Sequence, residues 1–264
     1  MTDSTLQFIG TATTLLQHGP FTVLTDPNFL HQGQLAYLGH GLASRRVTEP
    51  ALQVGDLPPL DAVVLSHLHG DHFDRVAKAG LSKDLPIITT RQSARRLRRW
   101  GFSRAVALDT WESHELHKDG ATLTVTAAPG RHARGVLQAV LPHVMGSILE
   151  FAGPGVDPLS LYITGDTLVH DDLREIPARH PSLDVGLWHL GGTRVLGLLV
   201  TMDGRQGADL LEIVTPAMTV PIHYDDYTVF KSPLQDFLDE VQRRGLQGVR
   251  PIARGEVMTL PQRV

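Results

Sequence analysis

The sequence predicts a layered domain of the α/β or α+β class, and two observations carry this prediction. Short apolar segments of strand length recur along the chain, and fewer segments with helical periodicity stand between some of them. No internal repeat and no clear linker interrupts this pattern. We therefore expect a single domain over residues 1–264.

The predicted strands begin with a hairpin. TATTLLQ (11–17) and FTVLTD (21–26) flank the turn-forming HGP. DAVVLSH (61–67) is a short apolar run of the kind that forms a fully buried strand. The remaining predicted strands are PIIT (86–89), AVAL (105–108), LTVTAA (123–128), GSILEFA (146–152), LSLYITGD (159–166), DVGLWHL (184–190) and MTVPIHY (218–224).

Two segments are predicted as helices. RQSARRLRRW (91–100) is rich in Arg, which indicates either a solvated helix face or a surface for nucleic acid or anionic lipid, and the acidic chain favours the solvated face. The last helix begins at Ser232, which we expect to form a capping box with Gln235, and it ends at Gly245. Its apolar stripe consists of Leu234, Phe237, Leu238 and Val241.

Composition narrows the classes of function. Charged residues make up 20% and hydrophobic residues 42% of the chain, which predicts a packed globule. The formal net charge of −4 disfavours nucleic acid as a partner, so we expect a small-molecule substrate, and a homo-oligomer remains open. No signal peptide or membrane-spanning run is evident, so we expect a cytoplasmic protein. Cysteine is absent, so a metal site would use His, Asp and Glu.

The stretch VVLSHLHGDH (63–72) carries the strongest chemical signal. His67 and His69 lie two residues apart after a buried strand, so both side chains can face one ion. Asp71 and His72 follow Gly70 in the next loop and can face a second ion. The alternative, a polar helix cap with chance histidines, explains this density poorly. Three more ligand-type residues follow apolar strands, namely His132, Asp166 and His223.

This H-x-H-x-D-H motif, with the later histidines and the Asp of TGDT, resembles the metallo-β-lactamase superfamily. The resemblance implies a four-layer αβ/βα sandwich with a two-metal site. It implies that His67, His69 and His132 hold the first metal, that Asp71, His72 and His223 hold the second, and that Asp166 bridges both. The start of the chain is similar to the branch of ascorbate-6-phosphate lactonases and N-acylphosphatidylethanolamine-hydrolysing phospholipases D. True β-lactamases use Cys at the position of Asp166, so β-lactamase activity is not expected.

Such a site predicts a metal-dependent hydrolase. Two divalent transition metals, with zinc favoured over manganese or iron, would supply a bridging hydroxide near neutral pH and cleave an ester-type bond, a phosphodiester or a lactone. Asp71 is the expected proton carrier. The alternatives are a metal-binding sensor with little turnover and a di-iron oxidoreductase on the same fold.

Three further residues are candidates for supporting roles. Asp26 could orient a ligand histidine or form the turn before Pro27. His189 could donate a proton to the leaving group or be a packed histidine. Tyr224 could contact an oxyanion or be a core aromatic residue.

A long insert, residues 28–59, follows a predicted strand end and lacks clear periodicity. We expect it to fold over the metal site and contact the substrate through side chains such as Tyr37 and Leu38. The alternative is a cover over the edge of a sheet.

Overall fold

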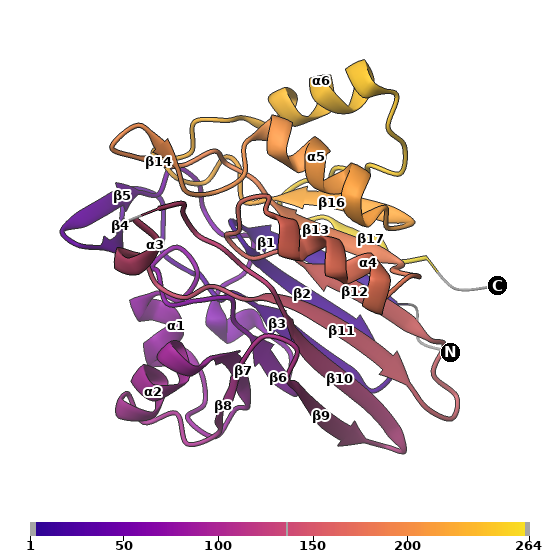
Figure 1. Ribbon diagram of the computed structural model, residues 1–264. Helices are drawn as coiled ribbons and strands as arrows, with labels where there is room; N and C mark the ends of the chain where they lie inside the picture. Colours follow the sequence, from indigo (N-terminus) through magenta and orange to yellow (C-terminus); the bar gives the residue numbers. More distant parts are fainter. Residues whose placement is uncertain (1–3, 136, 262–264) are drawn as a thin grey trace.

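The computed structural model describes residues 4–135 and 137–261 and contains two β-sheets packed face to face (Figure 1). The first sheet has seven strands in the order β17 (Val257–Thr259), β1 (Thr5–Gly10), β2 (Thr13–His18), β3 (Phe21–Thr25), β6 (Ala62–Val64), β7 (Ile87–Thr90) and β8 (Ala105–Leu108). The second has six in the order β16 (Met218–Ile222), β13 (Val185–His189), β12 (Leu159–Ile163), β11 (Gly146–Ala152), β10 (Ala121–Ala128) and β9 (Ser113–Lys118).

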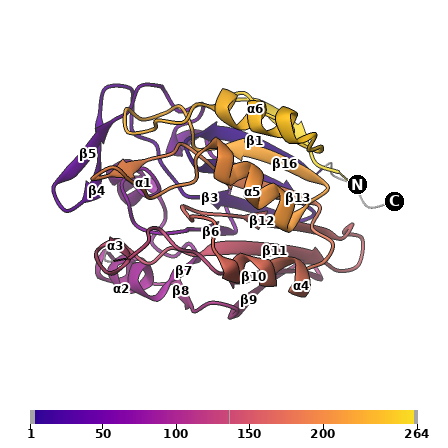
Figure 2. The ribbon, with the colours of Figure 1, turned by 45° about the horizontal axis from the view of Figure 1, so that its top comes forward.

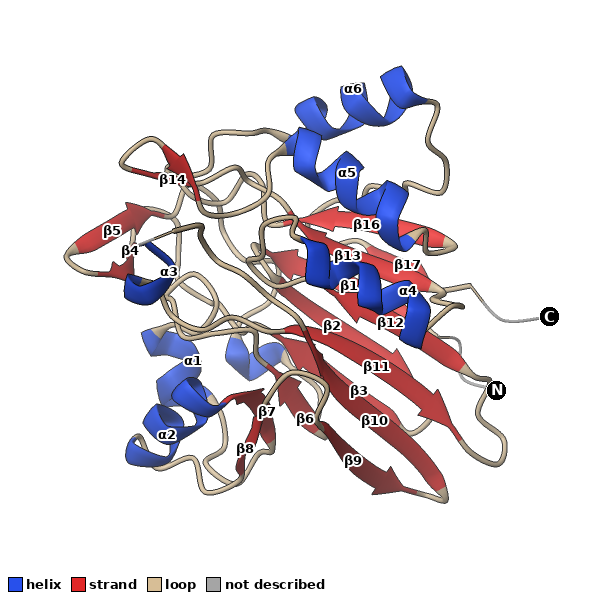
Figure 3. Ribbon diagram, viewed as in Figure 1, coloured by secondary structure: helices blue, strands red, loops and turns tan. Residues whose placement is uncertain are grey.

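Helices cover the outer face of each sheet (Figure 3). Helices α1 (Arg75–Gly80) and α2 (Arg91–Arg99) lie on the first sheet. Helices α4 (Glu175–Arg179), α5 (Gly204–Val214) and α6 (Leu234–Arg244) lie on the second. The short elements are η1 (Val54–Asp56), α3 (Leu137–Val140) and η2 (Asp171–Arg174). The predicted αβ/βα sandwich is confirmed. None of the helices in the described ranges is long and apolar enough to cross a bilayer.

Three apolar clusters hold these layers together. The largest lies between the sheets and includes Val23 and Val64 of the first sheet and Leu149 of the second. Because neighbouring side chains of a strand point to opposite faces, Val63 belongs instead to the cluster under α1 and α2. The third cluster, around Trp188, lies under α4, α5 and α6. Burial on both faces explains why β6 and β13 are continuous apolar runs.

Helix α5 was not foreseen, because two glycines interrupt its helical pattern. A Cβ at Gly204 would lie 2.5 Å from the backbone nitrogen of Phe237, and one at Gly207 would lie 2.7 Å from Leu190. These glycines therefore let α5 approach α6 and β13 closely, at a cost in helix propensity. The helix begins at Asp203, whose side chain accepts a hydrogen bond from the backbone of Gln206.

The start of α6 differs from the prediction. Pro233 occupies the N-cap position and no side chain caps the helix, so the capping box predicted at Ser232 and Gln235 is wrong. The Ser232 hydroxyl donates instead to Asp236 (2.8 Å) and accepts from the backbone N–H of Gly204 (3.0 Å). It thus joins α6 to α5. The predicted end is confirmed, since Gly245 has the left-handed φ of 68°.

The insert contains a hairpin that its sequence did not predict, formed by β4 (Leu35–Gly39) and β5 (Leu42–Arg45). Figure 2 shows it at the same end of the sandwich as β14 (Arg194–Val195), which pairs with β15 (Leu198–Leu199). Arg46, fully buried, anchors the insert through Nη1 to the Asn28 carbonyl (3.1 Å) and through Nη2 to Asp226 (3.6 Å).

Candidate metal centre

The candidate ligands gather at one edge of the sandwich because the strands that carry them end there. β6 leads to His67, β10 to His132, β12 to Asp166 and β16 to His223. Within the second sheet, β12, β13 and β16 run parallel, and β10 and β12 are both antiparallel to β11. Their carboxyl ends therefore meet at a common edge, where a rigid sheet fixes the following loop residues.

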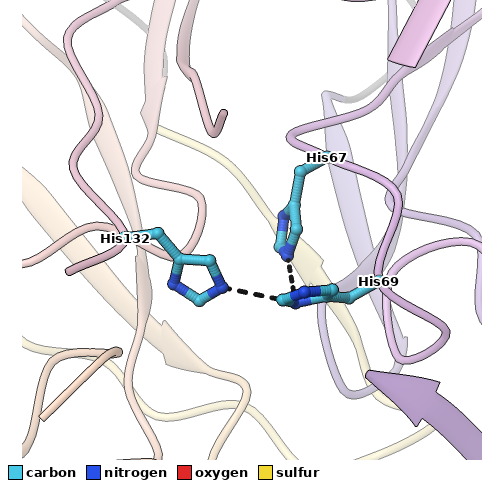
Figure 4. Close-up of side chains that lie close together, drawn as sticks. All are labelled: His67, His69 and His132. Carbon is cyan, nitrogen blue, oxygen red and sulfur yellow. Dashed lines mark hydrogen bonds between the residues drawn. The ribbon is translucent and has the colours of Figure 1, made fainter. Parts of the chain in front are cut away.

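Three histidines form the first group (Figure 4). His67 Nε2 lies 2.9 Å from His69 Nδ1, and His132 Nε2 lies 3.3 Å from the same Nδ1 atom. All three side chains are buried. Zinc–nitrogen bonds of about 2.0–2.1 Å in a tetrahedron place ligand atoms about 3.3 Å apart, so these spacings suit one ion.

The second group consists of Asp71, His72, Asp166 and His223, with one ligand atom of each within 4.8 Å of the others. Asp166 Oδ2 lies 3.2 Å from His72 Nε2 and 4.0 Å from His67 Nε2. Asp71 Oδ2 lies 3.6 Å from His223 Nε2. Asp166 thus stands between the two groups, where a bridging ligand would stand.

Several buried atoms of the second group lack a hydrogen-bond partner. They are Asp71 Oδ1, His72 Nε2, Asp166 Oδ1 and His223 Nε2. A buried polar atom without a partner costs about 1–3 kcal/mol, and a charged one costs more. Cations between these atoms would satisfy them, and a donor set of imidazole nitrogen and carboxylate oxygen suits zinc, manganese or iron. The residues therefore fit a pair of metal ions.

The outer nitrogens of the rings are held by fixed acceptors. His132 Nδ1 donates to the Val200 carbonyl (2.8 Å) and His223 Nδ1 to the Leu190 carbonyl (3.1 Å). His67 Nδ1 lies 3.0 Å from the Ser66 hydroxyl. Such contacts select the tautomer that directs the other nitrogen into the site. His223 also has a positive φ of 64°, a strained backbone state that turns its side chain toward the ligands.

Asp26 contacts His72 of the second group at Nδ1, the ring nitrogen that faces away from the other candidate ligands. Its Oδ2 atom lies 3.2 Å from His72 Nδ1, and its Oδ1 accepts a hydrogen bond from the backbone of Ser66 (2.7 Å). Burial raises the pKa of Asp26, but the His72 charge and the bond with His189 outweigh it and hold the pKa at about 2. The carboxylate therefore stays ionised and can orient His72.

Of the other two supporting candidates, His189 lies beside the second group, with one ligand atom within 4.8 Å of one each of Asp26 and His72, whereas Tyr224 packs under the helices. His189 is fully buried with Nε2 3.3 Å from Asp26 Oδ2 and Nδ1 3.2 Å from the Thr164 hydroxyl. Tyr224 is partly buried among the apolar side chains under α5 and α6, and burial raises its pKa to about 12.

The two groups differ in how readily they bind protons. Burial lowers the pKa of His67 and His132, and it lowers that of His69 to about 3. Burial also lowers the pKa of His72 and His223, but the neighbouring carboxylates together outweigh it and raise both pKa values, Asp166, Asp26 and Asp71 at His72 and Asp166 and Asp71 at His223. The first group therefore presents neutral nitrogens near neutral pH, which metal binding requires.

Sequence reasoning missed the residues behind the ligands. Ser66 stands beside His67 in the motif, so its role could have been inferred from that position. The carbonyl groups of Leu190 and Val200 give no sequence signal, because any residue supplies one. Only the fold shows that the chain returns to the histidines at these two points.

A cavity of about 220 Å³ opens on the metal centre. His69, Asp71, His132 and Asp166 form its inner wall. The other lining residues are Leu38, Leu42, Ala43, Leu141, Thr193, Arg194, Val195, Leu196, Val200, Thr201 and Val229. The hairpins β4–β5 and β14–β15 thus both contribute to an opening that is mostly apolar.

A sequence profile described as a β-lactamase superfamily domain matches residues 22–224 of this chain. The chain belongs to the metallo-β-lactamase superfamily. A superfamily relative from Mycobacterium tuberculosis, an uncharacterized protein, is 28% identical over 236 residues, which cover 86% of this chain. The chain spans 60% of that relative's length.

Two further proteins are similar. A metal-dependent hydrolase of Deinococcus radiodurans is 27% identical over 200 residues, which cover 75% of this chain and 80% of the relative. Among solved structures, an isothiocyanate hydrolase from Delia radicum gut bacteria superposes with a TM-score of 0.78 and 26% identity, over 97% of this chain and 98% of that one. The predicted superfamily is therefore confirmed by sequence and by fold.

Proposed function

We propose that this protein is a metal-dependent hydrolase with two divalent transition metals in its active centre, zinc being favoured. The observation that carries the proposal is the set of buried atoms without a hydrogen-bond partner in the second group, two of whose residues, Asp71 and Asp166, line the inner wall of a mostly apolar cavity. In this proposal the first metal is held by His67, His69 and His132, and the second by Asp71, His72 and His223. Asp166 contacts both metals.

When bound, the metals supply a hydroxide near neutral pH and polarise the electrophilic atom of the substrate. Asp71 lines the cavity, so the carboxylate oxygen that does not hold a metal can accept a proton there and pass it to the leaving group. We assign His189 the role of holding Asp26 in place, because its Nε2 faces that carboxylate. Tyr224 receives no role, because it packs under α5 and α6.

The cavity favours an uncharged substrate with an apolar body. Among the described residues that line it, Arg194 is the only Lys or Arg; its side chain is 50% exposed and lies 3.7 Å from Asp203. A phosphodiester would call for more positive charge beside the metals. Of the two ester-type bonds that the sequence predicts, we therefore favour the lactone, whose neutral carbonyl group suits this wall.

A second candidate substrate is an isothiocyanate. The similar isothiocyanate hydrolase shares the fold over nearly the whole chain. An isothiocyanate is small, neutral and electrophilic at carbon, and a cavity of about 220 Å³ suits such a molecule. Attack of hydroxide on that carbon would be served by the same residues.

The test is a turnover screen on metal-replete protein with four substrate classes: aliphatic lactones, aryl carboxylic esters, alkyl and aryl isothiocyanates, and bis-aryl phosphodiesters. We expect the best kcat/KM with a lactone or an isothiocyanate. Activity should be lost with a chelator and return with zinc or manganese. Highest efficiency on the phosphodiesters would refute the substrate assignment and leave the hydrolase assignment standing.

The same experiment separates the other two classes of function. A metal-binding sensor would bind two metals tightly and turn over none of the four substrate classes. A di-iron oxidoreductase would bind iron and consume oxygen in the presence of a reductant. Either result would refute the hydrolase proposal.

A further inference from the structure

A second cavity, of about 460 Å³, lies on the other face of β4 from the metal centre. Of β4, Leu38 lines the metal-centre cavity, whereas Leu35, Ala36, Tyr37 and Gly39 line the second one. His69 contributes to the walls of both. The second cavity is thus adjacent to the metal centre but separated from it by β4.

The wall between the cavities is fixed at two points. The backbone N–H of Gly70 donates to the Tyr37 carbonyl (2.9 Å), and a Cβ at Gly70 would lie 2.7 Å from the Tyr37 nitrogen. At the hairpin tip, His40 Nε2 lies 2.9 Å from the carbonyl of Val140 on α3. These contacts hold β4 against the motif loop on one side and against α3 on the other.

Three cations, Arg75, Lys78 and Arg96, line the second cavity. Across the described ranges, none of their side chains forms an ion pair. Lys78 Nζ lies 4.3 Å from the centre of the Trp100 ring, and the Arg96 guanidinium lies 5.2 Å from it. Positive charge is therefore concentrated around one aromatic residue.

The one carboxylate in the cavity wall does not neutralise these cations. Asp74 is buried and accepts hydrogen bonds from the backbone N–H groups of Phe29, Leu30 and Ala77 and from the Asn28 side chain. The carboxylate of Asp74 therefore binds backbone N–H groups at the start of the insert and at the start of α1, and not the three cations. Apolar side chains make up much of the rest of the wall, with Leu68, Phe73 and Trp100 among them.

We propose that this second cavity binds an organic anion with an apolar, ring-shaped or chain-like body. The acidic group would lie among Arg75, Lys78 and Arg96, where an anion relieves the mutual repulsion of three like charges. The apolar body would lie against Trp100, Leu68 and Tyr37. The cavity volume is within the range of about 300–1,000 Å³ that is usual for small-molecule sites.

The experiment compares two probes that share a ring system and differ in charge. 8-Anilinonaphthalene-1-sulfonate carries a sulfonate, whereas N-phenyl-1-naphthylamine is neutral. Binding is measured by fluorescence titration at constant ionic strength. We expect one saturable sulfonate site per chain, and R75Q/R96Q should weaken the binding of the sulfonate probe by about tenfold or more while changing that of the neutral probe by less than about twofold.

The matched control is R95Q/R99Q, which removes the same net charge and, like R96Q, alters exposed arginines of α2. Arg95 and Arg99 are exposed on α2, and neither lines the cavity. We expect this control to change sulfonate binding by less than about twofold. D166N, which alters the metal centre, should retain sulfonate binding, so failure of the proposed function would not be mistaken for failure of this site.

Three results would overturn the proposal. Equal weakening by both arginine pairs would show attraction by net charge alone. Equal affinity for the two probes in the wild-type protein would show that the cations bind no anion. Loss of sulfonate binding in D166N would place the probe at the metal centre. Thermal melts of all the variants establish that each compared protein is folded.

Discussion

The two ligand groups of the metal centre lie side by side but rest on different surroundings. The first has three histidines, and the outer nitrogens of His67 and His132 face a hydroxyl and a backbone carbonyl. The second contains two carboxylates of its own, and a third, Asp26, stands behind His72. The first group therefore has neutral imidazoles alone, whereas the second combines histidines with carboxylates.

The difference in carboxylate content between the two groups explains how one site can hold two positively charged ions close together. Repulsion between two divalent cations is strong in a buried site, and carboxylates on one side offset it. Asp166, 3.2 Å from His72 and 4.0 Å from His67, places negative charge between the groups. We expect the second group to depend on several carboxylates, whereas the first depends on three histidine nitrogens and on the shared Asp166.

The largest expected effect is that of D166N, which removes the one charge shared by both groups. Activity should fall by about a thousandfold or more, and bound metal should fall below two per chain. Turnover and elemental analysis of the same sample measure both quantities. The matched control is D172N, since Asp172 is an exposed carboxylate with 58% of its side chain accessible. Full activity and two metals in D166N would remove Asp166 from the centre.

Acidification should separate the two groups. The raised pKa values of His72 and His223 mean that protons compete with metal at those nitrogens already near neutral pH. The lowered pKa values of His67, His69 and His132 mean that protons compete there only at lower pH, with His69 at about 3. As the pH falls from about 8 to 5, we expect the second group to lose its metal first.

The measurement is metal content after equilibration and gel filtration at each pH. If the two metals are lost at two different pH values, the two groups differ in metal affinity as we expect. Simultaneous loss of both metals would mean that the bridging Asp166 couples them so tightly that the surroundings of each group do not matter.

A smaller effect is expected from D26N, which changes only the support behind His72. Loss of the charge beside His72 Nδ1 should weaken metal binding in the second group by about 10–100-fold, with the first group unchanged. Calorimetric titration of metal-free protein resolves the two binding events. Equal weakening of both events would show that Asp26 acts through the general stability of the loops, for which the change in melting temperature is the check.

The sequence singled out the candidate ligand residues, which the structure brings together, better than it singled out their surroundings. His67 to His72 follow a buried strand directly, and strand periodicity alone brings His67 and His69 to one side. His132, Asp166 and His223 could be selected because each follows an apolar run. The acceptors for the outer nitrogens could not be selected, since two of them are backbone carbonyls of Leu190 and Val200.

The elements of the fold likewise divide into those that the sequence predicted and those that it did not. Strands such as β6, β7 and β13 are buried on both faces and are apolar runs, which made them recognisable, whereas the polar, partly exposed β9 (SHELHK) was not recognised. Helix α5 escaped recognition because Gly204 and Gly207, which its packing on α6 requires, have low helix propensity. The β4–β5 hairpin of the insert was not predicted, because it is held in place by contacts with residues that are distant in the sequence. Arg46, which provides that anchoring, contacts Asp226, far along the chain.

The last and smallest effect concerns the route by which a substrate reaches the two groups. The metal-centre cavity is lined by two residues of the first group, His69 and His132, and by Asp71 and Asp166. His72 and His223 do not line it. A substrate should therefore approach from the side of the first group, under Leu38 of β4.

The insert was expected to contact substrate through both Tyr37 and Leu38, but these side chains lie on opposite faces of β4. L38A should change the ratio of kcat/KM between a long-chain and a short-chain lactone by several-fold, because an apolar contact of this size contributes about 1–3 kcal/mol to discrimination. Y37A is the matched control and should leave that ratio within about twofold, at constant metal content. If Y37A alters the ratio as much as L38A does, the two cavities form one substrate site and β4 does not separate them. If neither variant alters it, the insert is only a cover for the sheet edge.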